Sequence, residues 1–331
     1  MPDLRLTLAI GDYLHTRELA SGKVKPEGIN FTVLNHPFET IAYRFLASQE
    51  WEVSEFSLAT YCTLTAQSNA PMIGLPIFPS RVFRHGAIFI RENSSIKSAA
   101  DLKGKRIGIP QWTQTAGTYV RGWLAHDAGV PLDSIEWVQA GVNDAGRKEM
   151  ARFQLPPGYR LTSVQDRSLG ELLVDGDIDA VISARAPNVF LDGKHGVKRL
   201  IPDYREQEQC YFRKTGIFPI MHIIVLRRDA YEANRWIARN LLEAFERAKR
   251  GCLPELGQNQ TSFLPTAWSS DHVEDTNRLL FPDGDVFPYG VEKNRRTLEP
   301  FLTWCHEQGV TGRKLAVEEL FPQEVGVEWK I

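Results

Sequence analysis

Apolar and polar residues alternate along several short stretches of the chain, and this pattern predicts β-strands. In the run LRLTLAI at residues 4–10, leucine or isoleucine occupies every second position. Further strand-like runs lie at residues 30–34, near 53, and at 87–91, 106–109, 178–182 and within 217–226. Apolar residues at helical spacing predict helices at 40–48, after the turn at 110–115 to about 128, and at 230–250 and 291–308. Alternation of the two patterns is typical of an α/β protein with mostly parallel sheets.

The stretch between the last two predicted helices is rich in turn-forming residues. Residues 251–290 contain four prolines and an Asp-Gly pair, so we expect irregular structure there.

The length of 331 residues exceeds the size at which one hydrophobic core usually stops growing, so two lobes are expected. The segments SAADLKGKRIGI (98–109) and ELLVDGDIDAVIS (171–183) resemble parts of the second lobe of type II periplasmic solute-binding proteins. This resemblance implies a two-lobed periplasmic-binding-protein-like α/β fold, in which each lobe is a mostly parallel sheet flanked by helices and a ligand cleft separates the lobes. Lobe one would comprise residues 1–92 and 215–331, and lobe two residues 93–214, with hinge crossovers near 91–94 and 212–216.

The charge of the chain is nearly balanced, with 39 basic and 41 acidic residues and no long block of either sign. Nucleic acid and anionic lipid are therefore not the expected partners. The N-terminus reads as a strand rather than a signal peptide, and no apolar run is long enough to span a membrane. Four cysteines lack the spacing of a zinc site. We expect a cytoplasmic protein with a small-molecule partner.

Candidate site residues were sought at the ends of predicted strands, because ligands of open parallel sheets bind there. Arginine suits carboxylates because its planar fork matches them with two hydrogen bonds, although each arginine here could instead be structural. A histidine in an apolar strand could exchange protons near neutral pH or be a satisfied core residue. A carboxylate could be a general base or a helix cap, and threonines before a helix could bind an anion or simply cap it. The candidates are Tyr13, Glu55, Ser57, Arg81, Arg84, His85, Thr113, Thr115, Ser183, Arg185 and His222.

Several catalytic signatures are missing from the sequence. It contains no HxH or HxxxH pair, no glycine-rich phosphate loop and no GxSxG elbow. Zinc hydrolase, nucleotide-binding and serine hydrolase functions therefore have no support. We expect no organic cofactor, while a divalent metal held by dispersed ligands stays open.

Seven segments that together cover nearly the whole chain resemble those of 4,5-dihydroxyphthalate decarboxylases. The most diagnostic are RVFRH (81–85), SARAP (183–187) and GIFPIMH (216–222), and they occur in the same order. The resemblance implies decarboxylation of a dihydroxylated aromatic dicarboxylate, giving protocatechuate and CO2 if the substrate is 4,5-dihydroxyphthalate.

A route through protonation of the ring carbon suggests roles for the candidates. Arg185 with Arg81 or Arg84 would clamp the substrate, His85 and His222 would share acid and base duties, and Glu55 or Tyr13 would orient the hydroxyl groups. Two alternatives stay open: a non-catalytic binding protein for an aromatic acid, related to transporter receptors, and an enzyme acting on another small ring. A homodimer is possible.

Overall fold

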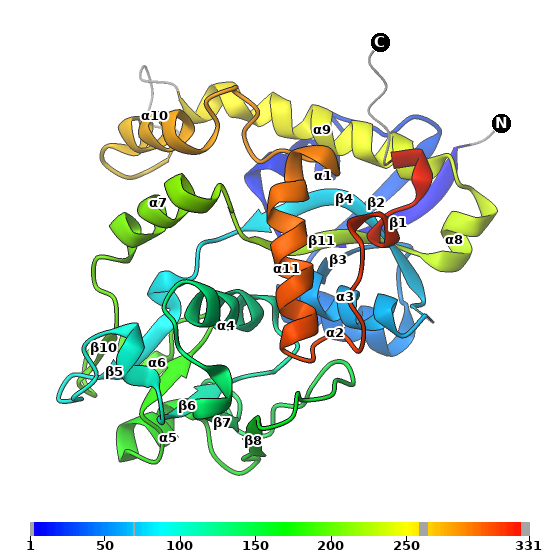
Figure 1. Ribbon diagram of the computed structural model, residues 1–331. Helices are drawn as coiled ribbons and strands as arrows, with labels where there is room; N and C mark the ends of the chain where they lie inside the picture. Colours follow the sequence, from blue (N-terminus) through cyan, green and yellow to red (C-terminus); the bar gives the residue numbers. More distant parts are fainter. Residues whose placement is uncertain (1–2, 69, 258–263, 326–331) are drawn as a thin grey trace.

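The computed structural model describes residues 3–68, 70–257 and 264–325, and it contains two β-sheets (Figure 1). The first sheet has the strand order β2-β1-β3-β11-β4, and the second has the order β10-β5-β9-β6-β7-β8. The strands of the first sheet are β1 (Leu4–Ile10), β2 (Ile29–Asn35), β3 (Val53–Ser57), β4 (Met72–Arg81) and β11 (Ile220–Arg227). Those of the second are β5 (Ile88–Arg91), β6 (Arg106–Ile109), β7 (Glu136–Gln139), β8 (Arg160–Ser163), β9 (Ala180–Ile182) and β10 (Val197–Arg199). Each sheet forms the centre of one lobe.

Both sheets are mostly parallel, with antiparallel strands where the chain passes between lobes. β1 pairs in parallel with β2 and β3, whereas β11 is antiparallel to β3 and β4. In lobe two, β6 to β9 run parallel and β5 is antiparallel to β9 and β10. The carboxyl ends of the parallel strands therefore supply loops to one edge of each sheet.

The first crossover between lobes lies earlier in the chain than expected. β5 hydrogen-bonds to strands of the second sheet, so the crossover falls between Arg81 and Ile88 rather than near 91–94. The polar residues after Arg91 form a turn inside lobe two instead. The return connection runs from Arg199 through α7 to Ile220 and includes residues 212–216.

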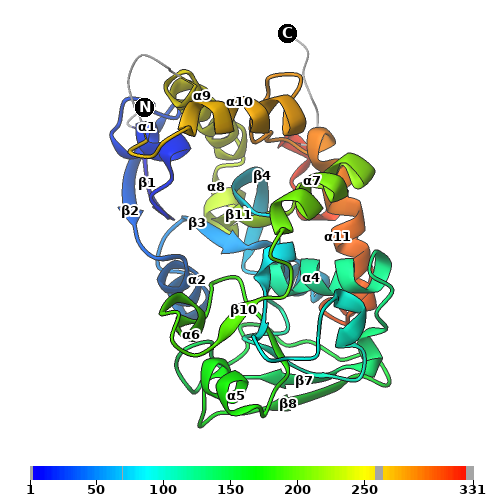
Figure 2. The ribbon, with the colours of Figure 1, turned by 90° about the vertical axis from the view of Figure 1, so that its left-hand side faces the viewer.

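Helices cover both sheets and also link them (Figures 1 and 2). α11 packs against α3 of lobe one and α4 of lobe two, and so connects the lobes. The helices are α1 (Arg17–Ala20), α2 (Phe38–Ser48), α3 (Leu58–Ala66), α4 (Thr115–His126), α5 (Leu169–Asp175), α6 (Asn188–Leu191), α7 (Tyr204–Thr215), α8 (Arg228–Ala233), α9 (Ile237–Leu256), α10 (Ser269–Leu280) and α11 (Arg295–Glu307), with short 3₁₀ turns between several of them.

Residues 251–290 contain more helix than we expected. α9 continues through Gly251 to Leu256, and α10 forms between Pro265 and Pro282. A glycine inside a helix costs only about 1 kcal/mol, so Gly251 does not end α9. The two prolines flank α10 rather than interrupt it, which is why the expectation of irregular structure was wrong here.

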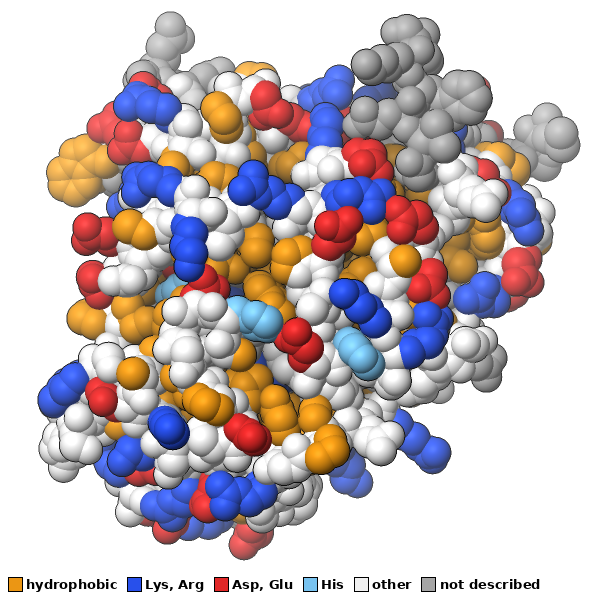
Figure 3. Space-filling view, in the orientation of Figure 1, with side chains coloured by type: hydrophobic (Ala, Val, Ile, Leu, Met, Phe, Trp, Pro, Cys, Tyr) orange, Lys and Arg blue, Asp and Glu red, His pale blue; other side chains and the backbone are white. Residues whose placement is uncertain are grey.

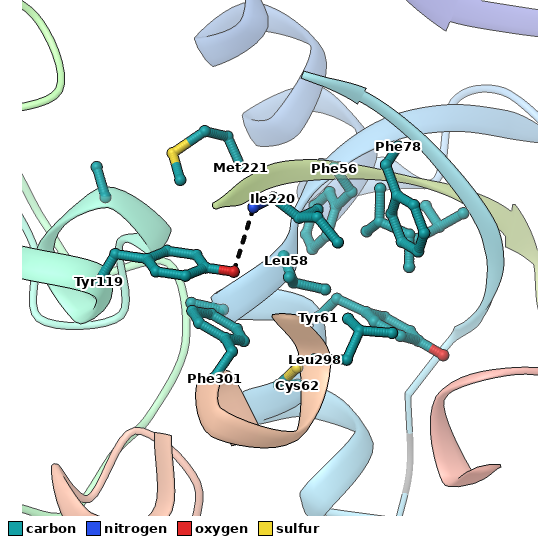
Figure 4. Packing of buried hydrophobic residues seen from close by; sticks show 14 of the residues in the cluster. Phe56, Leu58, Tyr61, Cys62, Phe78, Tyr119, Ile220, Met221, Leu298 and Phe301 are labelled. Atoms are coloured by element: carbon teal, nitrogen blue, oxygen red, sulfur yellow. Dashed lines mark hydrogen bonds between the residues drawn. The ribbon is translucent and has the colours of Figure 1, made fainter. Parts of the chain in front are cut away.

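A shared core joins the lobes on the side of α11. Tyr119 of α4 stacks on Phe301 of α11 with ring centroids 4.6 Å apart, and its hydroxyl accepts a hydrogen bond from the backbone N–H of Ile220 at 3.2 Å (Figure 4). Leu58 and Met221 belong to the same cluster. This packing fixes the crossover into β11, which carries His222.

The surface agrees with the balanced charge of the sequence. On the face shown in Figure 3, basic and acidic side chains intermingle and no large patch of one sign forms. Within the described ranges, no helix is both long and apolar enough to cross a bilayer.

Candidate functional site

A cleft of about 650 Å³ separates the two lobes, and most of the candidate chemistry faces it. Lobe one contributes α2, the end of β3 and the start of β11. Lobe two contributes the loops that follow β6, β7 and β9. Loops after parallel strands converge at such an edge, so the cleft lies where an α/β protein normally binds ligands.

Glu55 lies behind the lobe-one wall of the cleft and is completely buried in β3. Its Oε2 accepts a hydrogen bond from the backbone N–H of Gly11 at 2.8 Å. Its Oε1 accepts a hydrogen bond from the hydroxyl of Tyr13 at 2.5 Å and lies 2.5 Å from Nδ1 of His222. Both carboxylate oxygens are therefore satisfied by protein groups.

His222 connects this buried carboxylate to the cleft. Its side chain is 19% exposed and lines the cleft, and its ring stacks on Phe38 with centroids 3.7 Å apart. The pairing of β11 with β4 is irregular on both sides of His222, and such bulges commonly redirect a side chain beside an active site. Since Nδ1 is held by Glu55, Nε2 is the ring nitrogen left for a ligand.

The electrostatics of this chain favour an ionised Glu55. Burial alone would raise the pKa of Glu55, but the charge of His222 and hydrogen bonds from His222, Tyr13 and Gly11 outweigh it and lower the pKa below its ordinary value. Burial, together with the neighbouring Glu55, raises the pKa of Tyr13 well above its ordinary value. Tyr13 therefore stays a neutral donor, and a carboxylate stands ready to stabilise a protonated His222.

Arg84 is a cation of the cleft whose hydrogen bonds go to uncharged groups, although the negative charge of Glu208 also acts on it. Its Nε donates to Sδ of Met221 at 3.1 Å and its Nη1 to the carbonyl of Ala184 at 3.0 Å. No ion pair to Arg84 forms among the residues that the structure describes. Burial lowers the pKa of Arg84 to about 10, so the guanidinium is still charged at neutral pH and can bind an anion.

The serine and threonine hydroxyl groups predicted for the site differ in whether they have a hydrogen-bond partner. Ser57 and Thr115, both in the cleft wall, lie 2.9 Å apart and hydrogen-bond to each other across the two lobes. Ser183 is also in the wall and buried, but its hydroxyl has no hydrogen-bond partner in the described part of the chain. Ser183 is therefore the hydroxyl best placed to bind a ligand.

Arg81 and Thr113 do not line this cleft, contrary to the prediction. Arg81 is buried and donates to the carbonyls of Phe218 and Pro288 and to Oδ1 of Asn294. Thr113 donates its hydroxyl to Glu149 at 2.9 Å. Both side chains hold loops in place, because Nη1 and Nη2 of Arg81 and the hydroxyl of Thr113 bind groups of the protein.

Arg185 reaches the cleft, but its guanidinium is already paired with a carboxylate of the protein. Its Nη2 lies 2.5 Å from Oε2 of Glu39, a residue of α2. The Arg185 side chain is 68% exposed, so the pair lies at the cleft surface and joins the two lobes. The predicted clamp of Arg185 with Arg81 is not what the structure forms.

His85 lies away from the cleft that contains His222. It is buried between Trp123 and Tyr211, with ring centroids 4.8 and 5.0 Å away. Neither ring nitrogen has a hydrogen-bond partner among the described residues, although Nδ1 lies 3.8 Å from Oε1 of Glu208. Burial lowers the pKa of His85 to about 4. The predicted sharing of acid and base duties between these histidines therefore has no support in the geometry.

The roles predicted for Glu55 and Tyr13 also change. Neither side chain lines the cleft, so they contact His222 rather than substrate hydroxyl groups.

A metal site was left open by the sequence, and the residues present do not fit one. No group of three or more His, Cys, Asp or Glu side chains that could hold a metal occurs in the described part of the chain. The Glu55 carboxylate and Nδ1 of His222 are directed at each other, which leaves only one ring nitrogen as a ligand.

Several cleft residues were missed by the sequence reasoning. Phe38 carries no sequence signal, because an aromatic residue at a helix start is usually core. Gln114 adds a buried carbonyl oxygen without a partner. The segment 141–148 also lines the cleft, and its polar, glycine-containing sequence directly after β7 is a signal that could have identified it.

Comparisons with known proteins agree with this architecture. Residues 81–153 match the family described as NMT1/THI5 like. The structure superposes on a putative periplasmic sulfonate-binding protein, SsuA of Methylobacillus flagellatus, with a TM-score of 0.54, 14% identity, and coverage of 98% of this chain and 93% of that one. This likeness confirms the two-lobed periplasmic-binding-protein-like fold.

Sequence relatives are closer. Over 322 residues the chain is 34% identical to a 4,5-dihydroxyphthalate decarboxylase of Comamonas testosteroni, and the match covers 97% of both chains. A protein of the same name from Pseudomonas putida is 36% identical over 214 residues, which cover 64% of this chain and 83% of that protein. The resemblance predicted from the sequence segments is thus confirmed over nearly the whole length, and the chain belongs to the 4,5-dihydroxyphthalate decarboxylase family.

Proposed function

We propose that the protein decarboxylates 4,5-dihydroxyphthalate, a dihydroxylated aromatic dicarboxylate, to protocatechuate and CO2. The names of the two relatives supply the substrate. The observation that carries the proposal is the buried Glu55–His222 pair, which opens into a cleft that also holds the cationic Arg84.

The reaction needs an acid above the aromatic ring. Direct loss of CO2 from an aryl carboxylate would leave an unstable aryl anion. Protonation of the ring carbon that bears the carboxylate avoids this anion, and a hydroxyl group para to that carbon donates the electron density that makes protonation possible. A positioned side chain acting as general acid typically accelerates such a step by about 10²–10⁴-fold.

His222 is the group suited to this role. In its protonated form, Nδ1–H donates to Glu55 and Nε2–H faces the cleft. Nε2 gives its proton to the ring carbon, forming a C–H bond. The carbon–carboxylate bond then breaks, its electron pair restores the aromatic ring, and CO2 leaves. His222 recovers a proton from solvent, so each turnover consumes one proton.

The negative charge of Glu55 allows the partly buried His222 to carry a proton. A protonated imidazole removed from water is unfavourable unless a counter-charge lies nearby. Glu55 supplies that charge 2.5 Å from Nδ1, and Phe38 holds the ring plane by stacking. Glu55 and Phe38 are positioning residues, because neither needs to contact the reacting atoms.

Arg84 and Ser183 are proposed to bind the substrate near His222. Arg84 approaches Met221, which precedes His222 in β11, so its charge lies close to the proposed acid. The departing carboxylate must not be held tightly, because only interactions that strengthen in the transition state accelerate the reaction.

Turnover of the purified protein tests the proposal. We expect release of protocatechuate and CO2 from 4,5-dihydroxyphthalate, unaffected by a chelator because the described residues do not form a metal site. The variant His222→Gln should lose turnover by about 10²-fold or more. His306→Gln is the matched control, since His306 is exposed near the end of α11.

Two results would contradict the proposal. Saturable binding of the dicarboxylate without turnover would identify a non-catalytic binding protein for an aromatic acid. Loss of activity on chelation, restored by one divalent metal, would replace the metal-free route.

The proposal also includes the cellular location and the oligomeric state of the protein. We place it in the cytoplasm, where the unpaired thiols of Cys62, Cys210, Cys252 and Cys305 would be kept reduced. Cell fractionation tests this location. We also propose that the protein is a homodimer. Light scattering of the purified protein tests this, and the mass of a monomer would contradict it.

A further inference from the structure

The loop after β7 places an arginine in the cleft, and the proposed mechanism does not use this arginine. Arg147 lies in the segment 141–148 and is partly buried. Its Nη2 donates to Oε1 of Gln111 at 2.9 Å, and its guanidinium carbon lies 5.8 Å from the centre of the Tyr43 ring. The guanidinium is therefore held by one residue from each lobe.

Gln111 and Tyr43 fix the position of this arginine. The Gln111 side chain is buried, and its Nε2 donates to the carbonyl of Lys148 at 2.6 Å and to the hydroxyl of Tyr43 at 3.3 Å. The same amide thus binds the loop, the arginine and α2. An arginine with its fork held in place loses little conformational freedom when it binds an anion.

Within the described ranges no carboxylate forms an ion pair with Arg147, and its buried Nε has no hydrogen-bond partner there. Asp144 is in the same loop and Glu39 in α2, but Glu39 pairs with Arg185. A buried, charged N–H group without a partner is unfavourable unless a ligand supplies an acceptor.

The cleft as a whole has an excess of positive charge. Its lining contains four basic side chains, against the two carboxylates of Glu39 and Asp144. The basic residues are Arg84, Arg147, Lys148 and Arg185. This excess of two charges matches a doubly negative ligand.

Arg147 lies at a different place in the cleft from the proposed acid. Phe38, which stacks on His222, and Tyr43, which contacts Arg147, are five residues apart in α2, a rise of about 7.5 Å along the helix axis. Arg84 approaches Met221 beside His222 and contacts the loop after β9, whereas Arg147 follows β7, two strands away in the sheet. Arg147 can therefore hold a group that does not react.

We propose that Arg147 binds the carboxylate that the substrate keeps after decarboxylation. This inference rests on the proposed function for the identity of the ligand. It makes Arg147 a binding and specificity residue, which distinguishes acidic from neutral catechols. Since the retained carboxylate is unchanged during the reaction, Arg147 should stabilise substrate and transition state alike.

The test compares two ligands that differ in one charge. Protocatechuate carries the retained carboxylate, and 3,4-dihydroxybenzamide replaces it by a neutral amide of similar shape. Calorimetric titration of the purified protein should show about tenfold or greater preference for the acid, as expected for hydrogen bonds to a charged group. In Arg147→Gln the preference should fall below about threefold, while Arg147→Lys, which keeps the charge without the fork, should retain part of it.

A control variant separates a specific contact from a general effect of charge. Arg160→Gln removes an exposed lobe-two arginine that pairs with Glu136 and lies outside the cleft lining. This variant should keep the preference for the acid within about threefold of the unmodified protein, because exposed charges are screened by water.

Steady-state kinetics give a second readout. Arg147→Gln should raise KM about tenfold with kcat nearly unchanged, the pattern of lost uniform binding. The inference is overturned if the unmodified protein shows no preference for the acid, if the preference persists in Arg147→Gln, or if both ligands weaken equally. A clear preference lost in Arg147→Gln, in a protein without turnover, would support the subsite and refute only the decarboxylase.

Discussion

The two walls of the cleft differ in how their polar side chains are paired. In lobe one, His222 lines the cleft and binds Glu55 behind it, and Tyr13 binds the same carboxylate. On the lobe-two wall, the hydroxyl of Ser183, Oε1 of Gln114 and Nε of Arg147 are buried and have no hydrogen-bond partner among the residues that the structure describes. Lobe one is therefore already organised for proton transfer, whereas lobe two keeps polar atoms that a ligand can satisfy.

Among the variants considered, Glu55→Gln should lower the activity most. The neutral amide cannot stabilise a protonated His222, so we expect kcat to fall about 10²-fold or more, with a smaller change in ligand affinity. Activity assays beside Glu50→Gln, which removes an exposed carboxylate paired with Arg44, measure this effect. Activity close to that of the unmodified protein would remove Glu55 from the mechanism.

The same variant should also change the stability of the protein in acid. The pKa of Glu55 lies below its ordinary value of 4.5, so its ionised form is favoured in the folded protein. Its contribution to the free energy of unfolding is fully present above pH 4.5 and is lost as the pH falls through the lowered pKa. Denaturant unfolding of Glu55→Gln should show a shallower loss of stability below pH 4.5.

Tyr13→Phe should lower kcat less than Glu55→Gln does. It removes one of the hydrogen bonds to Glu55 but leaves the carboxylate and His222 in place. We expect kcat to fall by less than about tenfold and the free energy of unfolding to drop by about 1 kcal/mol. A loss as large as that of Glu55→Gln would mean that Tyr13 has a direct role in the chemistry.

Ser183→Ala tests the lobe-two wall, and its effect on stability should have the opposite sign. Removing an unpaired buried hydroxyl should leave the unliganded protein equally or slightly more stable, while ligand affinity falls about three- to fivefold. Ser168→Ala provides the contrast, since Ser168 caps α5. That variant should lose about 1 kcal/mol of stability without a change in affinity.

Arg185→Gln should have the smallest effect. Arg185 is paired with Glu39 and mostly exposed, and such pairs contribute about 0–1 kcal/mol. We expect turnover and stability to stay within about twofold and 1 kcal/mol of the unmodified protein. A large loss of affinity would show that Arg185 leaves Glu39 and binds the substrate.

Part of the site could be predicted because its signals are local. Ser183 and Arg185 directly follow a buried strand, and Ser57 ends another, so the general rule for strand ends places all three in the cleft. His222 was identified by its polarity within an apolar run. The loop containing Arg147 obeys the same rule after β7, but β7 was not among the predicted strands, so the rule was not applied there.

The errors arose where the partner of a polar side chain decides its role. Arg81 and Arg84 are three residues apart in one motif, yet Arg81 is bound by carbonyls of lobe one and Arg84 reaches the cleft. His85, the next residue, is enclosed by Trp123 and Tyr211. Sequence spacing cannot separate these outcomes, because the contacts come from residues far away in the chain.

The sequence by itself determined the α/β class, the two lobes and the membership of the decarboxylase family, because periodicity and motifs are properties of contiguous residues. Only the tertiary structure decided that Glu55 binds His222, residues 167 positions apart, and that no described carboxylate forms an ion pair with Arg147. Pairing and burial depend on which distant segments pack together. They set the charge state of each side chain and thereby its chemistry.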